Sequence, residues 1–325
     1  MKFSTRFAMS AALGLTALAS SIAHAQAWPN KPIRFVNPFP AGGGTDTFAR
    51  PMAAVLTKQL GQSVVIENLG GAGGTVGAAV AAKAAPDGYT FLVGAIHHTI
   101  APSVYQKLTY DIEKDFVPIT VLAKVPNVVI SQPKQGFNSF KDLLTHAKAN
   151  PGKLTFATPG AGTAQQLAAE LVKVNQGLDL LHVPYKGMGP AMQDFLGGTV
   201  DLVFDGMGAS AAQVRAGKAK ALGLMAAKRS AQFPDIPTLA EQGYPGLEVT
   251  TWYGLWALKG TPQEVIDKMH VEIIKAANDD IVKNAWNNAS AELPTMSRAE
   301  MTSFVRSEVE RWGKVSKAAG IKVDN

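Results

Sequence analysis

Short apolar runs alternate with longer segments of helical periodicity along most of this 325-residue sequence. Residues 33–39, 63–68 and 89–95 read as strands, and the segments between them carry apolar residues at helical spacing. Alternation of this kind is typical of parallel sheets whose strands are joined by crossover helices. It therefore predicts an α/β fold, with a first helix at 47–60 in which Pro51 removes a backbone donor.

The second half of the chain repeats the arrangement. Hydrophobic residues make up 46% of the sequence, which is enough for a sizeable core, and the length suggests two domains. Further strands are expected at 154–158, 180–187, 199–206, 220–226 and 249–260, and further helices at 141–149, within 164–174, at 189–198 and through most of 262–325.

Two strand-to-helix junctions share an unusual composition. Residues 40–45 read Pro-Ala-Gly-Gly-Gly-Thr, and residues 158–163 read Thr-Pro-Gly-Ala-Gly-Thr. A glycine-rich turn into a helix exposes backbone N–H groups at the positive end of the helix dipole, where an anion can bind. One such loop is explained equally well as a tight turn, but two matching loops favour a ligand held between two similar domains. The hydroxyls of Thr45 and Thr163 add donors, and Asp46 is placed to cap the first helix.

The sequence offers little for catalysis or for nucleotide binding. It contains no G-x-x-x-x-G-K-[ST], G-x-S-x-G or H-E-x-x-H, and the glycines at 70–77 miss the spacing of a dinucleotide-binding loop. The absence of cysteine excludes a thiol nucleophile and a disulfide framework. We therefore expect a binding protein that is not an enzyme and that needs no cofactor and no metal.

Some polar and aromatic residues leave two interpretations open. His97 and His98 follow a predicted strand, where neighbours point in opposite directions and do not naturally bind one metal ion. A hydrogen bond into a cleft and a capping or surface role fit the two histidines equally. Asp205 either holds a donor in the cleft or caps the helix that follows it. The aromatic residues of the last predicted strand fit core packing better than a cleft lining: Trp252, Tyr253 and Trp256.

The first 25 residues have the pattern of a secretory signal peptide. Lys2 and Arg6 precede an uncharged apolar run at 8–23, and residues 23–25 match a small-x-small cleavage site. Cleavage after Ala25 would deliver a soluble mature chain to the periplasm, since no later apolar run reaches about 18 residues. The formal charge of +6 is dispersed, which argues against nucleic acid as a partner.

Several motifs follow one another in the order of one protein family. They are WPNKPIR (28–34), PFPAGGGTD (38–46), VVIENLGGAGGTVGA (64–78), AAPDGYT (84–90), ATPGAGT (157–163), HVPYKGMGPAMQDFLGGTVDLVFD (182–205), FPDIPTLAEQGYPG (233–246) and WYGLWALKGTP (252–262). With these motifs the chain resembles the extracytoplasmic solute receptors of tripartite tricarboxylate transporters, the Bug-type binding proteins. The resemblance covers essentially the whole mature chain.

The resemblance implies a two-domain periplasmic binding protein of the Venus flytrap type, each domain a mainly parallel sheet flanked by helices. Domain 1 is expected at 26–123 and 250–325 and domain 2 at 124–249, with hinge motion near 122–127 and 247–252. It also implies a small mono- or dicarboxylate that is clamped between the domains without chemistry.

The resemblance further assigns ligand-binding residues. A ligand carboxylate is expected at the first glycine-rich loop and its counterpart in domain 2: Ala41, Gly42, Gly43, Gly44, Thr45 and Asp46, and Gly160, Ala161, Gly162 and Thr163. Further candidates are Tyr185 and Asp205 at matching strand ends and, at the distal end of the ligand, His98 beside His97. The chain departs from the family pattern at Asn37 and at Pro51, and the proline leaves the start of the first helix open.

The expected partner is a membrane transporter of the tripartite tricarboxylate type, to which a monomeric receptor delivers its ligand. A ligand-sensing role beside a sensor kinase uses the same closed form, so the sequence does not separate the two. A periplasmic enzyme acting on a carboxylic acid is the third interpretation. Both loops meet only the carboxylate that all such ligands share, so the sequence does not say which acid is bound.

Overall fold

The computed structural model describes residues 28–294, 296–318 and 320–323. The expected signal peptide therefore lies outside the described residues. Among the helices of the described ranges, each is too short or too polar to cross a lipid bilayer.

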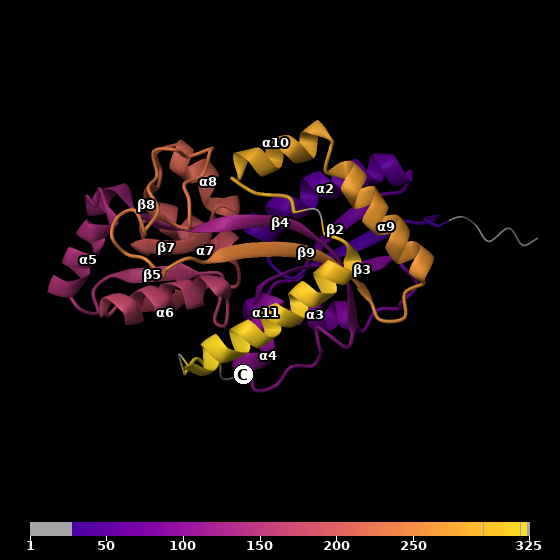
Figure 1. Cartoon of the computed structure of the whole chain (residues 1–325), viewed down its shortest axis with the longest axis horizontal. Helices are drawn as coiled ribbons and strands as arrows, with labels where there is room; N and C mark the ends of the chain where they lie inside the picture. Colours follow the sequence, from indigo (N-terminus) through magenta and orange to yellow (C-terminus); the bar gives the residue numbers. More distant parts are fainter. Residues whose placement is uncertain (1–27, 295, 319, 324–325) are drawn as a thin grey trace, which may run out of the picture.

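A mixed sheet of nine strands runs through the described part of the chain (Figure 1). Its strand order is β2-β1-β3-β9-β4-β7-β5-β6, and β8 pairs with β4. The strands are β1 (Ile33–Asn37), β2 (Val64–Asn68), β3 (Thr90–Ala95), β4 (Phe116–Ser131), β5 (Thr155–Thr158), β6 (Leu181–Pro184), β7 (Leu202–Gly206), β8 (Lys220–Met225) and β9 (Thr250–Leu258).

The long strand β4 changes partners along its length. Residues 116–126 pair with β9, whereas residues 127–131 pair with β7 and β8. We call the half of the molecule with β1, β2, β3 and β9 lobe 1, and the half with β5 to β8 lobe 2; they lie at opposite ends of the long axis (Figure 1). Only β9 in lobe 1 and β4 in lobe 2 run against their neighbours, which confirms the predicted mainly parallel sheets.

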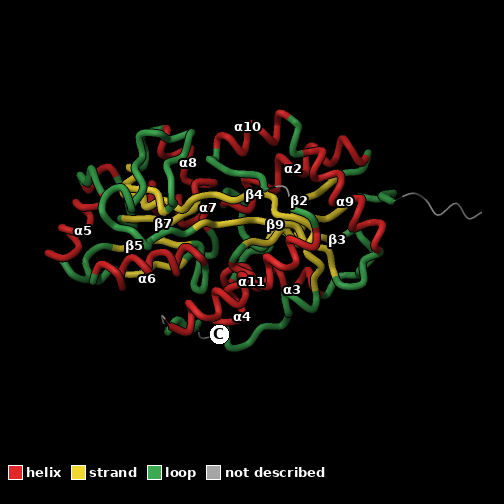
Figure 2. Tube along the Cα trace, in the orientation of Figure 1, coloured by secondary structure: helices red, strands yellow, loops and turns green. Residues whose placement is uncertain are grey.

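Helices cover both faces of the sheet (Figure 2). In lobe 1, α2, α9 and α10 pack on one face, and α3, α4 and α11 on the other. In lobe 2, α5 and α6 cover one face, and α7 and α8 the other. The helices are α2 (Gly44–Leu60), α3 (Thr75–Ala82), α4 (His97–Val104), α5 (Phe140–Ala149), α6 (Ala164–Gln176), α7 (Met188–Gly197), α8 (Met207–Arg215), α9 (Gln263–Ala276), α10 (Asp280–Asn288) and α11 (Arg298–Ala318).

The aromatic residues of β9 fill the core. Trp252, Tyr253 and Trp256 are at most 3% exposed and belong to the apolar clusters on the two faces of the sheet. The prediction of core packing is therefore confirmed for these three side chains.

The first helix does not start where the sequence suggested. It begins at Gly44 rather than at residue 47, and Pro51 lies inside it. Proline removes one backbone donor, but Met52, Val55 and Leu56 are buried directly after it. Burial of that apolar face outweighs the lost hydrogen bond, so the helix continues through the proline.

Two other local features differ from what the sequence suggested. His97 and His98 do not alternate along extended backbone; they form the first turn of α4. The long strand β4 was not predicted, because Pro118 and Pro126 interrupt its apolar pattern and proline is typical of edge or broken strands.

Candidate functional site

In both lobes, helices that follow parallel strands begin at the boundary with the other lobe. In lobe 1 these include α2 and α4, and in lobe 2 they include α6, α7 and α8. We call residues 40–46 the first glycine loop and residues 158–163 the second glycine loop. The positive ends of the five helix dipoles gather between the lobes, which favours a negatively charged guest there.

The first glycine loop provides no hydrogen-bond acceptors for the backbone N–H groups at the start of α2. Gly43 is the N-cap residue, and no side chain caps the helix. The first helical hydrogen bond runs from the Thr47 N–H to the Gly43 carbonyl at 3.0 Å. The amides of Gly44, Thr45 and Asp46 donate to no acceptor within the described residues, although all three residues are buried. Buried amides of this kind form an anion site.

The Asp46 carboxylate fixes the shape of the first glycine loop. Its Oδ2 accepts from the Gly42 N–H at 3.2 Å and from Arg50 Nε at 2.7 Å. Its Oδ1 accepts from the side-chain amides of Asn37 at 3.3 Å and Asn68 at 3.2 Å. The prediction that Asp46 caps α2 is wrong, because its carboxylate accepts from the Gly42 amide and from three side chains but from no amide of the helix. The unusual Asn37 is explained by the same network.

The second glycine loop begins its helix in the same way, but the amides of Gly162, Ala164 and Gln166 have partners. The Thr163 hydroxyl caps α6 by accepting from the Gln166 N–H at 3.5 Å, and it donates to a carbonyl of the loop at 2.7 Å. The Gly162 N–H donates to the Gln166 side chain at 2.7 Å. The Ala164 N–H donates to His97 Nδ1 of lobe 1 at 3.1 Å. This loop is therefore held by its own helix and by the other lobe.

A third helix start, that of α8, carries Asp205. Its carboxylate accepts from the Ser210 hydroxyl at 2.7 Å, and the amides of Gly206 and Ser210 are directed at it. Burial raises the pKa of Asp205 to about 7. These contacts are those of a residue that supports the helix start. The first three amides of α8 donate to no acceptor within the described residues: Met207, Gly208 and Ala209.

The lobes touch where α2 and α8 begin. A Cβ added to Gly208 would lie 3.4 Å from the Cα of Gly44, and the Thr47 hydroxyl donates to the Gly208 carbonyl at 3.3 Å. A Cβ added to Gly44 would collide with the hydroxyl of Tyr253 from β9. Glycine at both positions therefore lets two positive helix ends meet over the central strands.

The outer part of the first glycine loop forms a rim against α7. Ala41 and Gly42 are exposed, and the carbonyl of Ala41 packs so closely on Gly189 that no Cβ would fit there. Gly43 faces lobe 2 as well, since a Cβ on it would lie 3.7 Å from the Met188 Cβ.

The remaining predicted residues lie around the second glycine loop or behind it. The Ala161 carbonyl accepts from the Tyr105 hydroxyl of lobe 1 at 2.8 Å. Tyr185 donates its hydroxyl to Asp194 at 2.7 Å, and burial together with that carboxylate raises the pKa of Tyr185 to about 12. The buried His98 ring lies 3.0 Å from the backbone of β3, and burial lowers the pKa of His98 to about 4. Gly160 packs against Gly73 of lobe 1, 3.4 Å from a Cβ added to Gly160.

The sequence analysis did not identify the starts of α7 and α8 as parts of the site between the lobes. Both carry Gly-Met-Gly, at 187–189, separated by two residues from the end of β6, and at 206–208, starting with the last residue of β7. This repeated tripeptide was the available signal, because it places bare backbone at a strand-to-helix junction in the same way as the two longer glycine loops.

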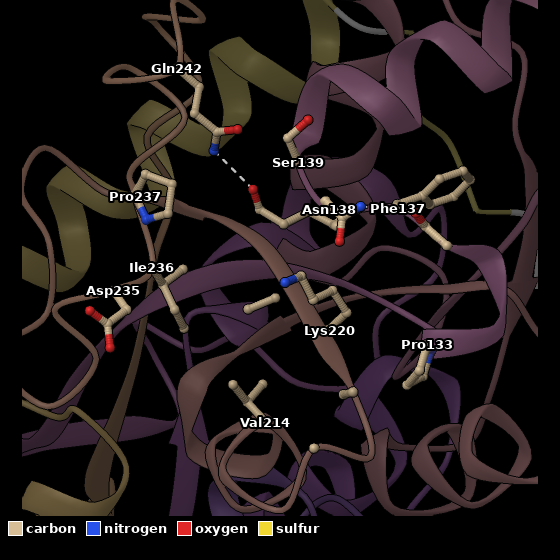
Figure 3. A pocket seen from close by; sticks show the side chains of 15 residues that line it. Pro133, Phe137, Asn138, Ser139, Val214, Lys220, Asp235, Ile236, Pro237 and Gln242 are labelled. Carbon is tan, nitrogen blue, oxygen red and sulfur yellow. Dashed lines mark hydrogen bonds between the residues drawn. The ribbon is translucent and has the colours of Figure 1, made fainter.

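Other kinds of site find little support. Among the described residues, no three His, Cys, Asp or Glu side chains are placed to hold a metal ion. Figure 3 shows a hollow of about 550 Å³ lined by Lys220, Asp235 and Gln242. Its lining residues all belong to lobe 2 and include neither glycine loop, so it is not the site between the lobes.

Comparison with known proteins agrees with this arrangement. The model of the tripartite tricarboxylate transporter family receptor matches residues 48–321. The periplasmic binding protein BugD is 36% identical with a TM-score of 0.88, covering 92% of this chain and 100% of its own. R. palustris Rpa4515 with adipate is 35% identical with a TM-score of 0.88, covering 92% and 100%. MatC from Rhodopseudomonas palustris with bound malate is 32% identical with a TM-score of 0.84, covering 89% and 99%.

These similarities extend over nearly the whole of each matched chain, and they confirm the two-domain periplasmic binding protein fold that the motifs suggested. The chain therefore belongs to the tripartite tricarboxylate transporter receptor family, as a Bug-type solute-binding receptor.

Proposed function

We propose that this receptor captures a small organic acid, a mono- or dicarboxylate, between its lobes in the periplasm and delivers it to a tripartite tricarboxylate-type membrane transporter. Export would follow cleavage after Ala25, and the receptor would act as a monomer. Domain 1 would comprise 26–123 and 250–325, and domain 2 would comprise 124–249. The change of partners within β4, after residue 126, supports a hinge near 122–127.

The observation that carries the proposal is the contact between the starts of α2 and α8. Three amides at each start have no acceptor within the described residues, and Gly44 and Gly208 bring the two ends together. Two positive helix ends repel each other, and a carboxylate between them both relieves that repulsion and accepts N–H bonds from each. The closed arrangement is therefore most stable around an anion.

The side chains beside these amides suit a small carboxylate. Arg50 pairs with Asp46, so the acidic residue of the first glycine loop does not leave an uncompensated negative charge near the guest. Adipate and malate, bound by the two related proteins, are both short dicarboxylates. We infer that this chain takes an acid of the same class.

A thermal-shift and calorimetric panel tests the ligand class. We expect adipate, malate or a homologous short dicarboxylate to raise the melting temperature in proportion to the logarithm of its excess over Kd. The matched diamides, which have the same chain length and no charge, should leave it unchanged. Equal shifts from acids and diamides, or none from any organic acid, would contradict the proposal.

Gly43→Val tests the position of the ligand. Its branched side chain would enter the contact with Met188 of lobe 2 and keep the lobes apart, so the ligand-induced shift should disappear while the unliganded melting temperature stays nearly the same. Gly197→Val is the matched control, because a Cβ at that position meets open space. Normal binding by Gly43→Val would argue against closure on the first glycine loop.

Delivery requires a separate experiment. Cells that lack this receptor should lose uptake of the labelled acid that binds it, and the wild-type gene should restore that uptake. Retained uptake together with loss of a transcriptional response to the acid would instead favour the sensor role.

A further inference from the structure

One histidine of lobe 1 makes a contact that depends on closure. His97 is the first residue of α4, which packs with α11 and β3 in lobe 1. Its Nδ1 accepts from the N–H of Ala164, the first residue of α6 in lobe 2, at 3.1 Å. Separation of the lobes necessarily breaks this bond.

The bond fixes the protonation state of the imidazole. A backbone N–H only donates, so Nδ1 of His97 must carry a lone pair, and the ring must be the neutral form protonated at Nε2. With a proton on Nδ1, two donors would face each other inside a contact where the ring is only 5% exposed. The positive ends of the α4 and α6 helix dipoles also disfavour a positive charge on the His97 ring.

Among the described residues, no carboxylate lies beside His97 to stabilise an imidazolium. The ring packs edge-on against Phe39, the residue before the first glycine loop, at 5.3 Å between centroids. The titratable residues nearest to it in the chain are His98 on α4 and Tyr105 directly after α4, whereas Tyr110 contacts His98. Burial and the adjacent His98 lower the pKa of His97 to about 3, and burial raises the pKa of Tyr105 to about 12. Tyr105 therefore stays neutral across the range in which His97 can change.

We propose that His97 is a positioning residue for ligand retention: its neutral imidazole latches the start of α6 to lobe 1, and its protonation in the separated form makes release of the ligand proton-linked. This inference rests on the proposed function, because retention presupposes a ligand between the lobes. The latch explains why the Ala164 amide, unlike those of α2, has a partner from the protein itself.

The direction of the pH effect follows from the two states. In the open form the ring meets water and its pKa returns toward the ordinary 6.5, whereas in the closed form it is lowered to about 3. The closed form therefore binds fewer protons, so closure is fully favoured above about pH 6.5 and weakens as pH falls below it. The closing constant should fall by up to about tenfold per pH unit between pH 6 and 4.

The chain is well suited to a direct measurement of closure. It has no cysteine, so Val80→Cys on α3 and Val174→Cys on α6 can carry spin labels without background; the two side chains are 41% and 75% exposed. Pulsed dipolar spectroscopy would report the closed fraction from pH 8 to pH 4, with adipate or malate as probe and without either. Histidine ¹⁵N shifts on the same samples would report the tautomer and protonation state of His97.

Three substitutions separate the latch from a packing role. His97→Gln keeps an acceptor that does not titrate, so closure should be close to wild type at pH 8 and should lose most of its decline toward pH 5. His97→Phe keeps a ring of similar size but no acceptor, and should weaken probe affinity roughly tenfold at pH 8. His146→Gln, on α5 in lobe 2, is the matched histidine control and should retain the wild-type profile.

The outcomes decide between the two proposals. A wild-type closed fraction that is equal at pH 8 and pH 5, or a His97→Gln profile as steep as wild type, would overturn the latch while leaving carboxylate binding intact. Titration of the probe and of Asp205 is common to both proteins and cancels in that comparison. Failure of every carboxylate to bind at pH 8 would overturn the proposed function. The ¹⁵N shifts test the latch independently of the probe, because a His97 that titrates near 6.5 in a sample that the spin labels show to be closed contradicts it.

Discussion

The starts of α2 and α6 resemble each other in sequence but differ in where their amides point. Both follow a strand and a glycine-rich turn that ends in Gly-Thr, although Thr45 lies inside α2 whereas Thr163 precedes α6. At α2, three successive buried amides donate to no acceptor within the described residues. At α6, the threonine caps the helix and His97 takes the first amide. Similar sequences thus produce one helix start arranged for a guest and another that helps to hold the lobes together.

The difference arises from the residue that supports each turn. Asp46 lies inside the first turn of α2 and bonds outward, to Gly42, Arg50 and two asparagines, so it shapes the loop without using the helix amides. Thr163 precedes α6 and bonds inward, to Gln166. A supporting side chain placed after the helix start leaves the amides free, whereas one placed at the N-cap position occupies them.

The largest effect is expected from Gly44→Ala. A methyl group there collides with the Tyr253 hydroxyl and must displace the first turn of α2. Because charge-assisted hydrogen bonds to the ligand would be lost with that turn, we expect affinity for the bound carboxylate to fall about hundredfold or more by calorimetry. Circular dichroism and urea unfolding should show a retained fold. Affinity within threefold of wild type would mean that α2 does not hold the guest.

The sequence predicted the local turns of this site but not the contacts between distant segments. Glycine spacing is local, so the strand-to-helix turns at 40–46 and 158–163 could be found without a structure. The meeting of Gly44 with Gly208 could not, because it joins segments far apart in the chain. Neither could the partner of Ala164, since nothing in a lone His97 indicates which backbone amide it will reach. Strand β4 was not predicted because Pro118 and Pro126 interrupt its apolar pattern.

The second largest effect should come from Asp46→Ala, which removes four hydrogen bonds from the first glycine loop. Because the side-chain amide of the buried Asn37 loses its acceptor and the loop loses its support, the free energy of unfolding should fall by roughly 3 kcal/mol in urea titrations. Arg50→Gln is the matched control. Its side chain is 52% exposed, so loss of that ion pair should cost about 1 kcal/mol or less. Equal losses in the two variants would show that the carboxylate does not organise the loop.

A pair of isosteric substitutions tests the contrast between the loops directly. Thr163→Val removes the cap of α6 and should lower the free energy of unfolding by about 1 kcal/mol, with ligand affinity changed less than twofold. Thr45→Val removes no hydrogen bond described in the protein, so stability should stay within about 0.5 kcal/mol while affinity falls several-fold. Thermal unfolding and calorimetry on both variants give the crossed comparison. If the two variants showed the same changes in stability and in ligand affinity, the two loops would be equivalent.

The smallest effect is expected from Tyr105→Phe, which removes the hydroxyl that reaches the Ala161 carbonyl across the lobes. One neutral hydrogen bond between the closed lobes contributes about 1 kcal/mol, so ligand affinity should weaken roughly fivefold while unfolding of lobe 1 is unaffected. Tyr89→Phe is the control, because its hydroxyl bonds to Asn30 within lobe 1. In the double variant Tyr105→Phe with His97→Phe, the loss of binding free energy should be less than the sum of the two single losses if both contacts hold the second glycine loop as one unit. Full additivity would instead mean that Tyr105 and His97 act on independent parts of the closed form, and the second loop would then have no single attachment to lobe 1.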